Sequence, residues 1–184
     1  MSDPDQDLVE RSKQGDKTSF GKLVSKHYDM VYAVIFGILR NREEALDVTQ
    51  DVFFKVFRDI QKFIGQSKFK TWLYRVAANG AIDHYRKRRP LEPIEDEADF
   101  ETKEVSPRES ASRREIRELV EEALDLLNPE QRAVFVLREW NELSYEEIAE
   151  SLQIEIGTVM SRLFYARKKL AQILGIKLKD NQHE

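Results

Sequence analysis

Apolar residues along this chain recur mostly at intervals of three and four positions, which is the period of a helix that buries one side. In the N-terminal part the pattern predicts four helices, at about 6–14, 17–40, 43–63 and 68–88. The buried side of the third includes Phe57, and Ser67 is the expected N-cap of the fourth. Only seven glycines and five prolines occur in 184 residues, so little interrupts these helices. The sequence therefore predicts an all-α fold that begins with a four-helix domain over residues 1–90.

The helical period stops at residues 91–112. Three of the five prolines fall between positions 90 and 107, and seven acidic side chains lie between Glu92 and Glu104. Proline-rich segments of one charge sign do not bury enough apolar surface to fold, so we interpret this stretch as a flexible acidic linker. The alternative is a solvated acidic loop inside one domain.

The second predicted domain, residues 113–184, has the outline of a helix-turn-helix. After an apolar helix at 113–127, Asn128 is followed by proline and, three positions on, by glutamine, and this pattern starts a new helix. Ser144 repeats the same capping logic before a helix of about two turns. A tight connection then leads into a long helix at 157–174.

Composition narrows the class of protein. Hydrophobic residues make up 41% and charged residues 35%, and 34 acids against 30 bases give a net charge of −4. Cysteine is absent and the three histidines are scattered, so we expect no disulfide, catalytic thiol, metal or cofactor. The longest apolar run, near 31–39, is too short to span a bilayer, and we expect a cytoplasmic protein without membrane insertion.

The near balance of charge conceals two basic segments. Residues 157–179 carry six bases and no acid, and residues 69–89 carry six bases against Asp83 alone. Aromatic residues are interleaved with the second set. Basic side chains bind phosphates and exposed aromatic rings stack on unpaired bases, which suits a single strand or a distorted duplex. We expect Trp72 to belong to the core instead, whereas Tyr74, which lies off the apolar stripe of its helix, is a candidate for contact.

The predicted helix at 43–63 also has an unusual polar face. Asp47, Gln50, Asp51 and Phe54 share it by their spacing. A solvated face explains most such charges, but an exposed phenylalanine among them favours a surface that another protein covers.

These segments together resemble the extracytoplasmic-function sigma factors, small promoter-recognition subunits of bacterial RNA polymerase. Residues 45–53, ALDVTQDVF, are similar to the family's polymerase-binding helix, and residues 69–79, FKTWLYRVAAN, to its segment that reads and melts the −10 element. Residues 143–149, LSYEEIA, and 157–163, GTVMSRL, are similar to its −35 helix-turn-helix. Met160 stands where some relatives have arginine.

The resemblance implies a role for each set of residues. Polymerase contact is implied for Asp47, Gln50, Asp51 and Phe54. Contact with the −10 element is implied for Ser67, Lys70, Tyr74, Arg75, Asn79, Arg86, Arg88 and Arg89. Contact with the −35 element is implied for Thr158, Met160, Ser161, Arg162, Arg167 and Lys168.

The implied partners are core RNA polymerase, promoter DNA and an anti-sigma factor, for a chain that is a monomer when free and binds DNA weakly by itself. The alternative is a sigma-like mimic that sequesters an anti-sigma factor without binding DNA. A free-standing helix-turn-helix regulator leaves the Asp47 face unexplained. An enzyme is the poorest fit, because the chain has no glycine-rich phosphate loop and its carboxylates follow capping and linker patterns.

Overall fold

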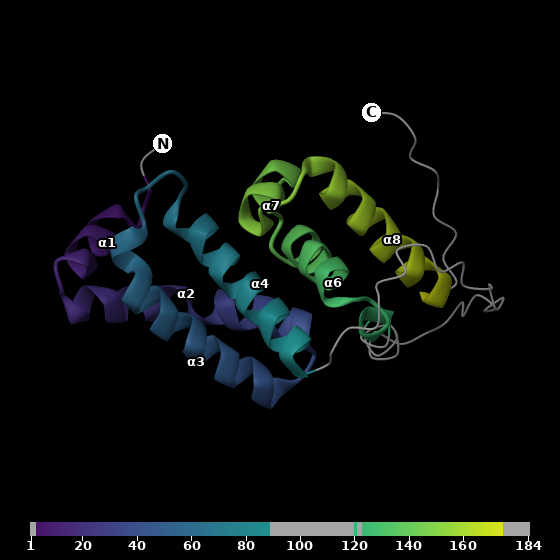
Figure 1. Ribbon diagram of the computed structural model, residues 1–184, viewed down its shortest axis with the longest axis horizontal. Helices are drawn as coiled ribbons and strands as arrows, with labels where there is room; N and C mark the ends of the chain where they lie inside the picture. The colour runs from purple at the N-terminus through teal and green to yellow at the C-terminus, as the bar shows by residue number, and fades with distance from the viewer. Residues whose placement is uncertain (1–2, 89–119, 121–122, 175–184) are drawn as a thin grey trace.

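The computed structural model describes residues 3–88, 120 and 123–174, and all regular structure within these ranges is helical (Figure 1). The N-terminal half contains α1 (Gln6–Lys13), α2 (Lys17–Leu39), α3 (Arg42–Asp59), η1 (Ile60–Lys62) and α4 (Phe69–Arg88). The C-terminal half contains α6 (Pro129–Phe135), η2 (Val136–Trp140), α7 (Tyr145–Leu152) and α8 (Ile156–Leu174). The predicted linker at 91–112 and most of the helix predicted at 113–127 lie outside the described residues.

Local capping sets the ends of α2 and α3. The Asp16 carboxylate accepts hydrogen bonds from the backbone N–H groups of Thr18 and Ser19 at 2.9 and 3.2 Å and starts α2. Arg40 closes α2 in the left-handed conformation, at φ 60°. The next residue, Asn41, then caps α3 by accepting from the N–H of Glu44. Two helices therefore meet at a turn of two residues.

The helix starts predicted in the C-terminal half are confirmed. Asn128 and Ser144 each form a complete capping box with the residue three positions later, Gln131 and Glu147 respectively. Gln153, at φ 55°, ends α7 and turns the chain into α8. One element was not predicted: η2 is a π-helix that continues directly from α6.

The start of α4 differs from the prediction. The spacing of the sequence suggested Ser67 as the N-cap, but α4 begins at Phe69, and the Ser67 hydroxyl makes only a long bond to the adjacent Lys68 carbonyl at 3.4 Å. The N–H of Phe69 instead donates to the Asp3 carboxylate at 2.5 Å. The cap therefore comes from the N-terminal segment, which α1 holds in place.

The core of the N-terminal half lies between α2, α3 and α4. Gly80 shows how closely α3 and α4 approach, because a β-carbon at this position would lie 3.0 Å from Val52 Cγ2. The glycine therefore permits close packing, and α4 runs on through it without interruption. Phe57 was predicted to be buried in this core, but its side chain is 45% exposed at the edge of α3.

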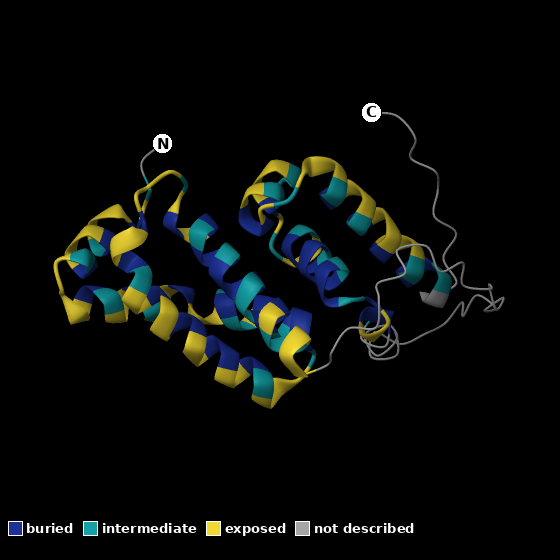
Figure 2. Cartoon of the chain, in the orientation of Figure 1, coloured by how far each residue is buried: buried dark blue, intermediate teal, exposed yellow. Residues whose placement is uncertain are grey.

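The two halves also pack against each other. Helices α6 and α7 lie beside α4, and α6 and η2 contact α2 (Figure 1). One continuous cluster of buried side chains extends from α1 through α4 into α7 and α8. Figure 2 shows this buried interior between the halves, while the outer side of α3 is exposed.

Candidate protein and nucleic-acid interfaces

The outer face of α3 gathers the four residues predicted to bind a protein. Asp47, Gln50, Asp51 and Phe54 follow a helical repeat and are all exposed, while the opposite side of the helix is buried in the core. Phe54 has 64% of its surface exposed. The structure thus places two carboxylates, an amide and an uncovered aromatic ring on one continuous face.

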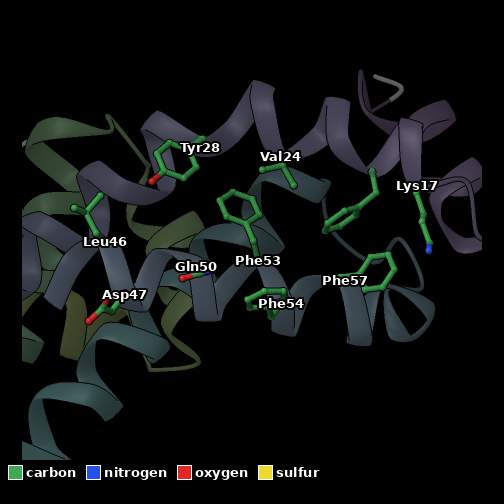
Figure 3. A pocket seen from close by; sticks show the side chains of 10 residues that line it. Lys17, Val24, Tyr28, Leu46, Asp47, Gln50, Phe53, Phe54 and Phe57 are labelled. Atoms are coloured by element: carbon green, nitrogen blue, oxygen red, sulfur yellow. The ribbon is translucent and has the colours of Figure 1, made fainter. Parts of the chain in front are cut away.

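A groove of about 740 Å³ between α2 and α3 adjoins this face (Figure 3). Aromatic rings form much of its wall: Phe20 and Phe57 meet edge to face at 4.9 Å between centroids, and Tyr28 stacks on Phe53 at 6.0 Å. Phe54 and Asp47 also line it. Sequence reasoning missed this groove because its residues come from two helices whose relative placement no local pattern specifies.

The residues predicted to meet DNA on α4 are unequally accessible. Lys70 is exposed, with its ammonium 5.6 Å from the centroid of the Tyr74 ring. Arg75 and Asn79 are half-buried. Tyr74 is only 4% exposed, and its hydroxyl lies 3.3 Å from Asn141 Oδ1 of the C-terminal half.

The expectation that Tyr74 lies off the buried stripe is therefore wrong for this conformation. Tyr74 is part of the buried cluster, and Asn141 of the C-terminal half lies against its hydroxyl. Burial, together with the nearby Glu147 carboxylate of α7, raises the pKa of Tyr74 to about 12, because both disfavour the phenolate. Trp72 packs against Phe63 and Phe69, as predicted for a core residue.

The basic end of α4 is engaged in ion pairs. Arg86 donates from Nη2 and Nε to one oxygen of Glu130, at 2.5 and 3.1 Å. Arg88 pairs with Glu44 of α3 at 2.5 Å. Arg89 lies outside the described residues. Arg86 and Arg88 were predicted to bind phosphates. In this conformation both side chains are paired with carboxylates of the protein itself.

The first two turns of α8 form an accessible surface. Met160 and Ser161 are exposed, and Thr158 and Arg162 are half-buried. The Ser161 hydroxyl donates back to the Thr158 carbonyl at 3.1 Å. The predicted residues at this end of α8 therefore lie where a groove of DNA could reach them.

Farther along α8 the surface includes residues that the sequence reasoning did not select. Phe164 and Tyr165 are exposed by 59% and 40% and meet edge to face at 5.6 Å. Lys168 is exposed, whereas Arg167 pairs with Glu139 at 2.6 Å. Two uncovered aromatic rings thus interrupt the basic surface.

The described ranges contain no group of three or more His, Cys, Asp or Glu side chains that could hold a metal ion. Within the same ranges, none of the helices has the length and apolar character needed to cross a membrane.

Family models match both halves of the chain. The model for sigma-70 region 2 matches residues 23–90, and the model for sigma-70 region 4 matches residues 117–170. The RNA polymerase sigma-H factor of Pseudomonas aeruginosa is 39% identical over 180 residues, which cover 92% of this chain and 93% of that protein. The ECF RNA polymerase sigma-E factors of Haemophilus influenzae and Escherichia coli are 36% and 37% identical, over 90% of this chain and 93% and 92% of theirs.

Two solved structures share the arrangement of helices. CnrH, in complex with the cytosolic domain of CnrY, matches with a TM-score of 0.68 and 25% identity over 92% of this chain and 96% of its own. The sigma factor RpoE of Bartonella quintana, in complex with the anti-sigma factor NepR, matches with a TM-score of 0.65 and 24% identity over 86% and 98%. The likeness to RpoE of Bartonella quintana shows a shared fold alone.

Proposed function

The chain belongs to the extracytoplasmic-function sigma factors, which direct RNA polymerase to promoters, and we propose that α3, α4 and α8 divide this task among three surfaces. It acts as a transcription initiation factor and not as an enzyme. The observation that carries the proposal is the exposed face of α3, which is separate from both basic helices. This face can therefore bind a protein while the residues assigned to DNA, which lie on other helices, remain available for DNA.

The α3 face binds core polymerase. Asp47 and Asp51 supply negative charge for basic side chains of the partner, and Gln50 lies between them on the same face. Phe54 supplies apolar area, and burying an exposed aromatic ring at the centre of an interface is among the strongest contributions to binding. The groove beside Phe54 gives that interface depth.

Helix α4 reads the −10 element and assists strand opening. Asn79 is the residue we assign to a base edge, because an amide both donates and accepts hydrogen bonds. Lys70 binds phosphates, as do Arg86 and Arg88 at the end of α4. Ser67 lies in the turn before α4, where an unpaired strand would pass.

Helix α8 reads the −35 element. Its N-terminal turns present Thr158, Ser161 and Arg162 toward the major groove, with Lys168 farther along the phosphate backbone. Met160 is 54% exposed and supplies an apolar contact where an arginine would have recognised guanine.

An anti-sigma factor is the regulatory partner that we assign to the chain. CnrH and the RpoE of Bartonella quintana, two proteins of the same fold, were each solved in complex with another chain, and the partner of the second is an anti-sigma factor. This partner covers the polymerase-binding and DNA-binding surfaces, in the compartment where polymerase works.

Run-off transcription with purified core polymerase tests the function. The chain should support transcription from promoters mapped by overexpression, and Phe54→Ala should weaken binding to core by about tenfold or more. Lys22→Ala, an exposed residue of α2 outside the groove, is the matched control and should bind as the parent does.

A chain that binds an anti-sigma factor but neither core polymerase nor promoter DNA would contradict the proposal. That result would identify it as the mimic instead.

A further inference from the structure

The connection between η1 and α4 is an exposed loop that begins and ends at buried rings. Phe63 and Phe69, at its two ends, are 8% and 1% exposed and meet edge to face at 5.7 Å between ring centroids. Residues 64–68 between them are mostly exposed (Figure 2). Gly65 adopts a left-handed φ of 76°, which lets the chain reverse its direction within this short span. The loop thus has two anchored ends and an accessible tip.

The N-terminal segment holds the end of the loop that leads into α4. Asp3 accepts the hydrogen bond from the N–H of Phe69 at 2.5 Å. Asp5, two residues later, is only 1% exposed; its carboxylate accepts from Lys26 Nζ at 2.5 Å and lies 2.9 Å from His27 Nε2, both in α2. The His27 ring in turn lies 5.7 Å from the Phe69 ring. A buried carboxylate thus fixes the segment that caps α4.

Helix α1 holds the opposite end of the loop. The side-chain amide of Gln61, in η1, donates to the carbonyl of Lys13 at the end of α1. The Lys13 ammonium also lies 5.8 Å from the centroid of the Phe63 ring. The loop is therefore ordered from both ends within the protein itself. A side chain presented in this way does not have to be immobilised when it binds, which avoids a cost that a flexible segment would incur.

Ile64 lies at the tip of this loop. It is 74% exposed, more than any other large apolar residue that the structure describes. Single exposed apolar residues are common on protein surfaces, so exposure alone indicates nothing. Here it coincides with a basic segment, because residues 60–82 carry four bases and no acid, and such a segment attracts DNA phosphates. Ser67, which we assign to the unpaired strand, follows three positions later in the same loop.

We propose that Ile64 is a wedge that enters between neighbouring bases of the −10 element and unstacks them as the strands open. Isoleucine is among the apolar side chains that proteins insert between base steps in this way. Unstacking is unfavourable, and a wedge offsets it only if its own position is fixed, which the N-terminal segment and α1 provide. The exposed Lys68 and Lys70 hold nearby phosphates. The place of the wedge at the −10 element rests on the proposed function, whereas the anchoring of the loop rests on contacts within the chain.

Run-off transcription from two forms of one promoter, with holoenzyme assembled from core polymerase and the full-length chain, tests the wedge. One form is fully paired, and the other carries mismatched bases that hold the −10 element open. Ile64→Ala should lower transcription from the paired form by about tenfold or more, the worth of covering an isoleucine side chain, and leave the mismatched form within about twofold of the parent. Ile64→Leu keeps the apolar bulk and should transcribe as the parent does. Leu126→Ala, a comparable truncation of a 60% exposed residue in the C-terminal half, is the matched control and should leave both forms unchanged.

Asp3→Ala tests the anchor separately, because it leaves Ile64 in place and removes the carboxylate that accepts from the N–H of Phe69. Transcription from the paired form should fall by about threefold or more, and the mismatched form should restore it. Asp3→Asn keeps an oxygen acceptor at the cap and should recover the parent rate. Binding of core polymerase should be unchanged in all of these variants, because none alters the α3 face.

Parent-level transcription from the paired form with Ile64→Ala would overturn the wedge. An equal loss on both forms would overturn it too, because a residue that acts only after the strands have separated does not open them. Unchanged transcription with Asp3→Ala would overturn the role of the anchor. A parent chain that fails to bind core polymerase, or to support transcription from either form, would instead refute the proposed function.

Discussion

At the scale of single residues, Tyr74 shows how a side chain can belong to two environments. Its spacing in the sequence predicts a position off the apolar stripe of its helix. In the folded molecule it is buried against Asn141 and lies near Glu147. Its ionisation therefore reports on the contact between the halves.

We expect Tyr74 to ionise only as the pH approaches about 12. The unfolded chain ionises this group near 10.0, so its effect on the free energy of unfolding is nil below that pH, and stability is lost progressively as the pH rises from 10.0 toward 12. Absorbance titration of tyrosinate, with Tyr74→Phe as the reference, measures the pKa. Glu147→Gln keeps the capping box of α7 and should lower this pKa without returning it to 10.0, because burial is the larger cause.

Gly80 lies where α4 approaches α3 closely. Alanine gains about 1 kcal/mol in helix propensity but places a methyl group 3.0 Å from Val52 Cγ2, and overpacking of that kind costs about 1–3 kcal/mol. We expect Gly80→Ala to lower the free energy of unfolding by about 1 kcal/mol in urea denaturation. Combining it with Val52→Ala, which vacates the crowded space, should give a loss smaller than the sum of the two single changes.

At the scale of elements, the sequence predicted those starts and stops that depend on neighbouring residues. The capping boxes at Asn128 and Ser144 lie within four consecutive positions, so their geometry follows from local chemistry alone. The cap of α4 does not, because Asp3 and Phe69 are 66 positions apart. The π-turn at η2 was equally invisible, since its shape is matched to Gly37 on another helix.

Mutation can distinguish Asp3 from Ser67 as the N-cap of α4. Asp3→Ala should destabilise the protein by about 1 kcal/mol, the usual cost of losing an N-cap, and should increase amide hydrogen exchange in the first turn of α4. Ser67→Ala should leave the free energy of unfolding within about 0.5 kcal/mol of the parent, because its hydroxyl bonds only to the adjacent carbonyl. A larger loss of stability with Ser67→Ala than with Asp3→Ala would instead identify Ser67 as the N-cap of α4.

At the scale of the whole molecule, the family assignment and both helical halves followed from sequence, while their mutual packing did not. Helical periodicity identifies which side of a helix is buried, but it does not say which distant helix covers a polar side chain. Arg132 illustrates this, because its position in a short capped helix gave no sign that it is buried against the Ile38 carbonyl. The four residues on α3 were correctly predicted to share one exposed face, because helical spacing alone determines that grouping.

The shared core predicts that the two halves unfold together. Calorimetry of the parent should show one transition. Arg132→Met leaves buried carbonyls without donors, at about 1–3 kcal/mol each, and should split that transition into two as the halves uncouple. Arg138→Met is the control, because Arg138 bonds only within the C-terminal half among the contacts that the structure describes, and it should lower the transition without dividing it. Two transitions in the parent would contradict the shared core.

The open α3 face beside a covered α4 has a consequence for how such a chain moves through a cell. A chromosome offers about 10⁶–10⁹ competing non-specific sites, and a protein with both basic helices uncovered would spend its time distributed among them. A chain in this conformation presents to the chromosome chiefly the basic surface of α8, so it is retained less and reaches polymerase sooner by diffusion. The rate at which polymerase receives this subunit then depends less on escape from the chromosome and more on the amount of free chain.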